Sequence, residues 1–258
     1  TGLTLLLSRQ GNETFPSVIS KKLPTGLISP LVSYLKEYRN KEVSIMAETD
    51  FTAVEIERKY LEDKLNVLIR NIGNIPIANT RIMPYGWRKA AKGRTVWRIV
   101  EEVISQGLES QANDLGFDSV HPADSEVGVY DFRFCYDGNK ESYVNIKSSV
   151  KGGRSNKDDI SKAAGLIDFY KKNPNANLYV ATFVISFKPD LTIGLETCSV
   201  FPTAWIPDIY INPSNNGNLQ SSKYKYLDSS IKRTPPEFLA CLIQENAVAT
   251  AKKKAKSK

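Results

Sequence analysis

Histidine is nearly absent from this sequence, which contains a single residue of this type, His121. Active sites built on a Ser-His-Asp triad or on a pair of histidine bases need imidazole groups in a defined setting, so one histidine makes these classes poor candidates. The phosphate-binding pattern Gly-x-x-x-x-Gly-Lys-Ser/Thr is also missing. If the protein is an enzyme, its chemistry falls to carboxylates, amides, lysines and a metal ion.

Cysteine is scarce as well, with three residues at positions 135, 198 and 241. They are far apart and odd in number, which fits neither a disulfide framework nor a zinc site and indicates reduced thiols. The sequence has no run of about 18 apolar residues that could span a membrane, and residues 1–10 lack the pattern of a signal peptide. We therefore expect a cytoplasmic protein.

Positive charge is concentrated at the C-terminal end. The net charge is +7, but residues 251–258 hold five lysines, so the rest of the chain carries only about +2. We expect 251–258 to form a solvated, mobile basic tail that makes at most weak phosphate contacts.

Hydrophobic periodicity predicts an α/β protein. The near-continuous apolar run at 177–187 is typical of a strand buried on both faces, with a hairpin partner at 192–202. The remaining predicted elements are helices at 29–40, 49–73, 94–116 and 158–173, strands at 127–136 and 141–150, and a short helix that begins near Pro235.

No linker in the chain requires a domain boundary. We interpret residues 1–93 as a helical elaboration with a basic loop, within the same globular unit as a core at 94–250. The amphipathic helix at 49–73 either packs on that core or forms a dimer surface.

Two adjacent predicted strands carry polar residues in a suggestive pattern. Asp131 lies in the first strand, and Asn145 and Lys147 lie two positions apart in the second. An even hairpin loop would turn Asp131 away from the other two side chains, whereas an odd loop or a bulge would bring all three to one face. The Asp-Gly-Asn sequence at 137–139 is compatible with a three-residue loop.

On one face, these residues would form a site for metal-assisted hydrolysis. Asp131, the amide oxygen of Asn145 and the carbonyl of Ile146 are hard oxygen ligands that suit Mg²⁺. Lys147 would orient a metal-activated water and stabilise developing charge. The spacing by itself is equally typical of a surface hairpin with ordinary polar residues.

Two basic segments are candidate phosphate contacts, although each also fits a solvated connector. The segment 79–94 interleaves aromatic residues with five basic residues, Arg81, Arg88, Lys89, Lys92 and Arg94. The segment that follows the second strand holds Ser148, Ser149, Lys151, Arg154 and Lys157 among glycines and serines.

The order of elements and motifs resembles the PD-(D/E)xK nucleases, especially type II restriction endonucleases. Asp131 matches the first acidic residue, and Lys147 in Asn-Ile-Lys matches the lysine of (D/E)xK. Either Glu101 or Glu102, on the preceding helix, matches the additional glutamate of many members.

The sequence departs from the family pattern in two places. Tyr130 stands where the family has proline, and Asn145 replaces the second acid, as in a known Asn-x-Lys variant among restriction enzymes. The loss of one negative charge should weaken metal affinity.

The resemblance implies a restriction-endonuclease-like core and a Mg²⁺-dependent, site-specific endonuclease. Its substrate would be double-stranded DNA, its products would have 5′-phosphate ends, it would act as a homodimer, and a cognate DNA methyltransferase would protect the same site. A second resemblance, over 200–223, suggests that Asn215, Asn216, Gln220 and Ser221 contact bases or phosphates, although an ordinary polar loop fits too. The alternatives are a repair or junction nuclease of the same fold, or a non-catalytic DNA-binding protein.

Overall fold

A computed structural model describes residues 51–88, 92–124, 128–153 and 157–256. Contacts divide the chain into residues 1–46 and 47–258. All described residues belong to the second of these units. The helix predicted at 29–40 lies outside the described residues.

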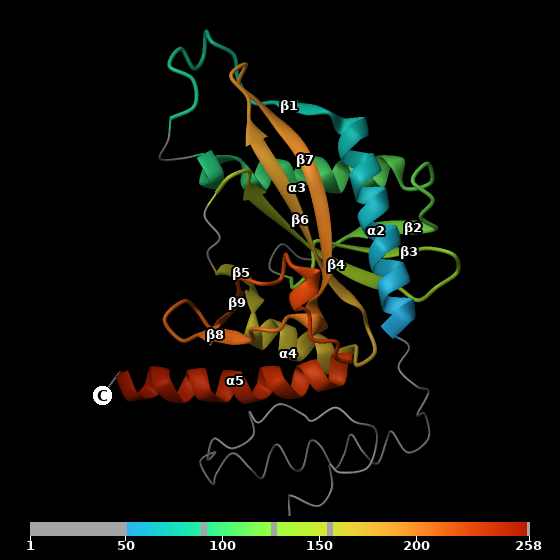
Figure 1. Ribbon diagram of the computed structural model, residues 1–258, viewed down its shortest axis with the longest axis vertical. Coiled ribbons are helices and arrows are strands. Elements are labelled where there is room, and N and C mark those ends of the chain that lie inside the picture. The colour runs from blue at the N-terminus through green and yellow to red at the C-terminus, as the bar shows by residue number, and fades with distance from the viewer. Residues whose placement is uncertain (1–50, 89–91, 125–127, 154–156, 257–258) are drawn as a thin grey trace, which may run out of the picture. The chain divides into compact units, whose positions relative to one another are not determined.

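The described elements include both helices and strands, and the predicted α/β class with a mixed central sheet and flanking helices is confirmed (Figure 1). In chain order they are α2 (Phe51–Ile72), β1 (Asn74–Pro76), α3 (Lys92–Gln111), β2 (Ser119–Pro122), β3 (Phe132–Cys135), β4 (Ser142–Val150), β5 (Asp158–Lys162), α4 (Ala163–Lys172), β6 (Leu178–Phe187), β7 (Thr192–Pro202), η3 (Thr203–Trp205), β8 (Tyr210–Asn212), β9 (Asn218–Ser221), η4 (Leu227–Ser229) and α5 (Pro235–Lys256). Of the helices in these ranges, none combines the length and the apolar character that a membrane span requires.

Within the described ranges, six strands form one mixed sheet in the order β1-β7-β6-β4-β3-β2. β4 and β6 are parallel, and the other neighbouring pairs are antiparallel. The apolar run of β6 is buried over 178–183, as a central strand requires. The predicted buried strand and its hairpin partner β7 are both confirmed.

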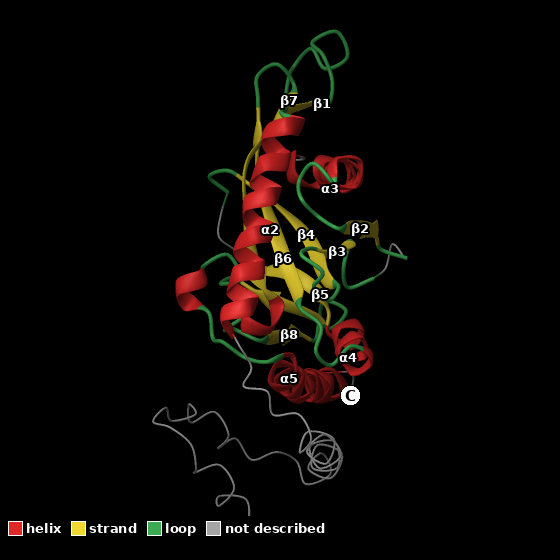
Figure 2. Cartoon of the chain, turned by 90° about the vertical axis from the view of Figure 1, so that its right-hand side faces the viewer, coloured by secondary structure: helices red, strands yellow, loops and turns green. Residues whose placement is uncertain are grey.

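Helices α2 and α3 cover one face of this sheet (Figure 2). Leu61, Leu65 and Leu68 recur at helical spacing on α2 and are fully buried, as are Val100 and Ile104 on α3. Burial of each large aliphatic side chain contributes about 1.5–3 kcal/mol. The interpretation in which the predicted helix at 49–73 packs on the core is therefore confirmed.

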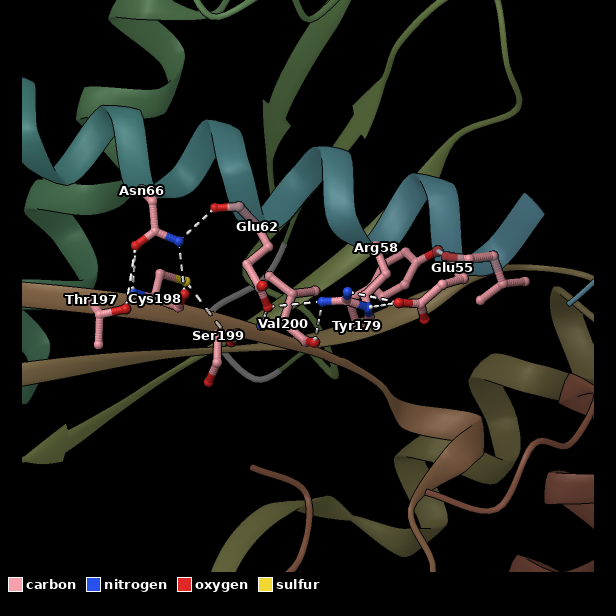
Figure 3. A network of polar contacts seen from close by, with 10 residues as sticks. Glu55, Arg58, Glu62, Asn66, Tyr179, Thr197, Cys198, Ser199 and Val200 are labelled. Atoms are coloured by element: carbon pink, nitrogen blue, oxygen red, sulfur yellow. Dashed lines mark hydrogen bonds and ion pairs between the residues drawn. The ribbon is translucent and has the colours of Figure 1, made fainter. Parts of the chain in front are cut away.

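Polar side chains of α2 also close the free edge of β7 (Figure 3). Arg58, Glu62 and Asn66 follow one another at intervals of one helical turn. Glu62 accepts a hydrogen bond from Val200 N at 2.8 Å, and Arg58 donates to Val200 O at 3.4 Å. Asn66 accepts from Cys198 N at 3.0 Å and donates to Cys198 O at 2.8 Å. Side chains thus take the place of a neighbouring strand on an edge that could otherwise pair with another chain.

The opposite face of the large sheet packs against a second layer. Among the described residues, this layer contains a three-stranded sheet in the order β5-β9-β8, with α4 and α5 packed against each other (Figure 1). Trp205, Tyr170 and Phe238 are almost completely buried in it. The polar residues of β4 therefore lie between two layers of structure rather than on an open surface.

Local sequence signals gave several wrong boundaries. The strand predicted at 127–136 is confined to β3, and α3 ends at Gln111 rather than at residue 116. The helix predicted at 158–173 is β5 followed by α4, because residues 158–162 pair with β9. Asp158 does not cap a helix; its carboxylate accepts hydrogen bonds from Tyr224 and Lys225.

The basic C-terminal segment is also more ordered than predicted. The short helix expected near Pro235 is the long helix α5, which continues to Lys256, so most of 251–258 is helical rather than a mobile arm. Alanine and lysine are strong helix formers, and lysines near a helix C-terminus interact favourably with its dipole. Residues 251–255 are exposed, in agreement with the expected solvation.

Candidate catalytic and DNA-binding site

The candidate site lies where β3 begins, beside the part of its neighbour β4 that extends past β3. β3 pairs with residues 142–144 of β4, and the β3 side of β4 has no paired strand among the described residues beyond that point. Asp131 directly precedes β3, and its Oδ2 accepts a hydrogen bond from Ile146 N at 2.5 Å. The Asp131 carboxylate therefore replaces the next backbone partner and is held against β4.

The β3–β4 hairpin has the register that brings Asp131, Asn145 and Lys147 together. Phe132 pairs with Val144, and the preceding residue, Asp131, donates from its backbone N to Val144 O at 2.8 Å. This is the odd spacing that places the side chains of Asp131, Asn145 and Lys147 on one face. The tip differs from the predicted three-residue loop, because positive φ angles at residues 137 and 138 are those of a tight type I′ turn.

Two acids and two cations influence one another at this position. Burial, together with the nearby Asp131 carboxylate, raises the pKa of Glu101 to about 7, against the opposing effects of Lys147 and Arg98. Burial also raises the pKa of Asp131, while the hydrogen bond from Ile146 N and the charges of Lys147 and Arg98 oppose that rise. The partly desolvated acids would be stabilised in their charged forms by a bound cation.

The structure separates the two glutamates that the sequence left as alternatives. Glu101 is half-buried beside Asp131 and Lys147, whereas Glu102 is exposed and accepts a hydrogen bond from Gln106 at 2.7 Å. A step of one residue turns a helix by about 100°. Glu102 is consequently rotated away from the site.

Asn145 is the most constrained of the predicted site residues. Its side chain is buried, and Nδ2 donates to Val129 O at 2.9 Å and lies 3.5 Å from Ile160 O. Its Oδ1 has no hydrogen-bond partner among the described residues. An unpaired buried oxygen costs about 1–3 kcal/mol. The amide is thus fixed by its nitrogen, and its oxygen is left for an external partner.

Backbone alternation gives the direction of the Ile146 carbonyl. Tyr143 and Lys151, at the two ends of β4, direct their N–H groups toward β6. Ile146 has the opposite parity and its N–H bonds to Asp131, so its carbonyl lies on the same side. Lys147 is half-exposed, and its side chain lies on the face of Asn145.

These groups fit a hard divalent cation. One carboxylate, one amide oxygen without a partner and one main-chain carbonyl are ligands that Mg²⁺ accepts. The described ranges contain no cluster of three or more His, Cys, Asp or Glu side chains arranged for a metal. A metal site here would therefore depend on the neutral oxygens of Asn145 and Ile146 as well as on Asp131.

The first predicted basic segment exposes cations beside aromatic rings. Arg81 and Arg88 are exposed, and the Arg88 guanidinium lies 5.4 Å from the ring centre of Tyr85, which is 80% exposed. Trp87 anchors this loop by donating from Nε1 to Lys188 O at 2.8 Å. Cation and ring together suit contacts with phosphates and bases.

Basic residues continue in the sequence onto α3. Lys92 and Arg94 lie in the first turn of this helix, and Lys89 lies outside the described residues. One turn further on, the Arg98 guanidinium stacks 4.1 Å from the ring centre of the exposed Trp97. This helix thus connects the basic loop to the acidic site.

The polar residues after Ile146 are less available than predicted. Ser148 and Ser149 are half-buried in β4. Lys151 is exposed, but its Nζ forms a 2.9 Å ion pair with Glu196. Hydrogen bonds from Ser186, Lys151 and Lys188 lower the pKa of Glu196 to about 2. Glu196 therefore remains charged and competes with a phosphate for Lys151.

The remaining predicted contacts lie on or near the small sheet. Asn216 is exposed in the turn between β8 and β9. Asn215 and Gln220 donate to the carboxylate of Asp159 at 2.8 and 2.6 Å. Ser221 is completely buried and its hydroxyl is bonded internally to Asp208, so it does not meet the expectation of a DNA contact.

The loop between β4 and β5 is described in part. Arg154 lies outside the described residues. Lys157 lies at the start of β5, with its Nζ 4.2 Å from the ring centre of Tyr210 on β8. This cation therefore belongs to the surface of the small sheet.

Comparison with known protein families gives no match between a family model and this chain, and no curated protein matches it. The arguments for function therefore rest on the geometry of the site. Sequence reasoning missed Arg98 and Asp159. Arg98 stands three residues before Glu101, a spacing that places both on one side of a helix, whereas nothing local distinguished Asp159 from a helix-capping residue.

Proposed function

We propose that the protein is a Mg²⁺-dependent endonuclease of the PD-(D/E)xK superfamily that acts as a type II restriction enzyme. The observation that supports this most strongly is the convergence of Glu101, Asp131, Asn145 and Lys147 at the start of β3. These residues come from three separate segments of the chain. Burial raises the pKa values of Glu101 and Asp131, and the neighbouring charges also influence them. Such perturbation is typical of functional sites.

The chain topology supports the same assignment. A helix that carries Glu101 precedes an antiparallel hairpin that carries Asp131 and Lys147, and a helix and a central parallel strand follow. The resemblance to restriction endonucleases rests on this series of elements. We therefore also propose that this chain has their core fold.

Each site residue has a distinct role in the proposed hydrolysis. Asp131, the Asn145 amide oxygen and the Ile146 carbonyl would hold Mg²⁺, which would polarise a phosphate oxygen and acidify a water. Lys147 would hold the attacking water in line and stabilise the negative charge that develops on the phosphate. Glu101, whose pKa is raised to about 7 in the metal-free protein, would become charged when Mg²⁺ binds nearby and could then accept or relay a proton.

The proposed substrate is double-stranded DNA, cut at a specific sequence to leave 5′-phosphate ends. The exposed Arg81 and Arg88 would contact the phosphate backbone, as would Lys92 and Arg94 at the start of α3. A palindromic site would be read by a homodimer, and a methyltransferase of the same specificity would protect the cytoplasmic DNA.

Incubation of a plasmid with the protein and Mg²⁺ tests this proposal. Discrete bands are the expected result, and they would be lost on chelation with EDTA. A smear would indicate a nuclease without site specificity. Intact plasmid together with a gel shift would indicate a non-catalytic DNA-binding protein.

A further inference from the structure

The outer face of the small sheet presents an unusual concentration of amide side chains. In β9, Leu219 and Ser221 are buried, so Asn218 and Gln220 point the other way. In β8, Ile211 is buried between two outward residues. The outward residues of the three strands are Asp159, Lys162, Tyr210, Asn212, Asn218 and Gln220.

Hydrogen bonds hold these groups in fixed orientations. Asn212 donates to Gln220 Oε1 at 3.2 Å, and Gln220 donates to Asp159 Oδ1 at 2.6 Å. Asn215 donates to Asp159 Oδ2 at 2.8 Å from the adjacent turn. A carboxylate has about four acceptor positions, so Asp159 retains acceptor capacity toward solvent after these two bonds.

This face is directly connected to the candidate catalytic site. Asp159 is followed by Ile160, whose carbonyl lies 3.5 Å from Nδ2 of the buried Asn145. Lys157 and Lys162 are exposed at the two ends of β5 and bracket the face with positive charge. This surface borders β4 and carries mainly amide side chains. It is therefore positioned to contact base edges, and the cations at its margins are positioned to contact phosphates.

We propose that this face reads base edges in the major groove of the duplex that the enzyme cleaves, with Asp159 as a specificity-determining acceptor. The inference rests on the proposed function. Carboxylates accept from the cytosine amino group, and glutamine and asparagine amides pair with adenine. The hydrogen bonds within this face hold its donors and acceptors in place, and so would determine which base edge the face can bind.

The test uses a pool of duplexes with a randomised central segment. The wild-type protein, Asp159→Asn and Gln220→Ala are each incubated with the pool and Mg²⁺, and the cut ends and the retained uncut duplexes are sequenced. Asp168→Asn, an exposed aspartate on α4 away from this face, is the matched control. Thermal melts of each variant verify the fold.

We expect both variants on the face to lose discrimination at the same base pair, by roughly 10-fold to 100-fold for a lost bidentate contact, with Asp168→Asn unchanged. Unaltered sequence preference in Asp159→Asn and Gln220→Ala, with normal cleavage, would overturn the inference and leave the proposed function intact. Sequence-selective binding without cleavage, altered by Asp159→Asn, would support the base-reading face and overturn the nuclease assignment. Absence of both cleavage and binding by the wild type would overturn both.

Discussion

Replacement of Glu101 by glutamine should stabilise the metal-free protein at alkaline pH. Burial and the neighbouring Asp131 raise the pKa of Glu101 from 4.5 to about 7. The folded protein therefore binds the Glu101 proton more tightly than the unfolded chain does, and the free energy of unfolding falls as the pH rises from 4.5 through 7. The pKa difference of roughly 2.5, at about 1.4 kcal/mol for each unit, corresponds to at most about 3.5 kcal/mol.

Urea unfolding in EDTA at about pH 5 and about pH 8 measures this effect. Glu101→Gln should be more stable than the wild type at the higher pH, and the difference should shrink to less than about 1 kcal/mol at the lower pH, which lies just above the unfolded pKa of 4.5. The matched control is Glu102→Gln, because Glu102 is exposed on the next position of the same helix. Saturating Mg²⁺ should reduce the advantage of Glu101→Gln, since a cation favours the charged carboxylate. If Glu101→Gln and Glu102→Gln gave the same stabilities at both pH values, the buried acid cluster described here would be wrong.

Three further outcomes follow from the site and its surroundings. Asn145→Asp should lower the Mg²⁺ concentration for half-maximal cleavage, whereas Asn145→Leu should raise it or abolish cleavage; coincident titration curves would remove Asn145 from the metal shell. Arg88→Ala should flatten the salt dependence of DNA binding by about one unit of slope. Lys151→Ala should flatten it less, because Lys151 pairs with Glu196, and Glu196→Gln should strengthen DNA binding by releasing Lys151. Equal slopes for the two alanine variants would contradict that ordering. The thiol of Cys198 should be alkylated only on unfolding, because burial raises its pKa; mass spectrometry of the folded protein checks this, and rapid labelling would count against the closed β7 edge.

Much of the fold could be predicted because its signals are local. The apolar run of β6 and the amphipathic period of α2 depend on residues close together in sequence. β5 could not be predicted in the same way, since residues 158–162 become a strand by pairing with β9, which lies far along the chain. Local propensity yields to such tertiary pairing, particularly for short strands.

The candidate site divides in the same manner. Asp131 and Lys147 could be found from the spacing of a hairpin, but that spacing left the parity of the loop open, and the register resolves it. The choice between Glu101 and Glu102 depended on the rotational phase of α3, which boundary errors of one or two residues obscure. Asp159 gave no local signal, because its role follows from partners that come from β8 and β9.

The most direct test of the account compares cleavage and binding by Lys147→Ala. The variant is assayed on the same plasmid in Mg²⁺, and its affinity for DNA is measured in EDTA, with Lys140→Ala, an exposed lysine in the β3–β4 connection, as the control. Lys147→Ala is expected to cleave at least about 100-fold more slowly than the wild type, while its metal-independent affinity for DNA stays close to that of Lys140→Ala. Cleavage by Lys147→Ala at the wild-type rate would contradict the assignment of the site at the start of β3.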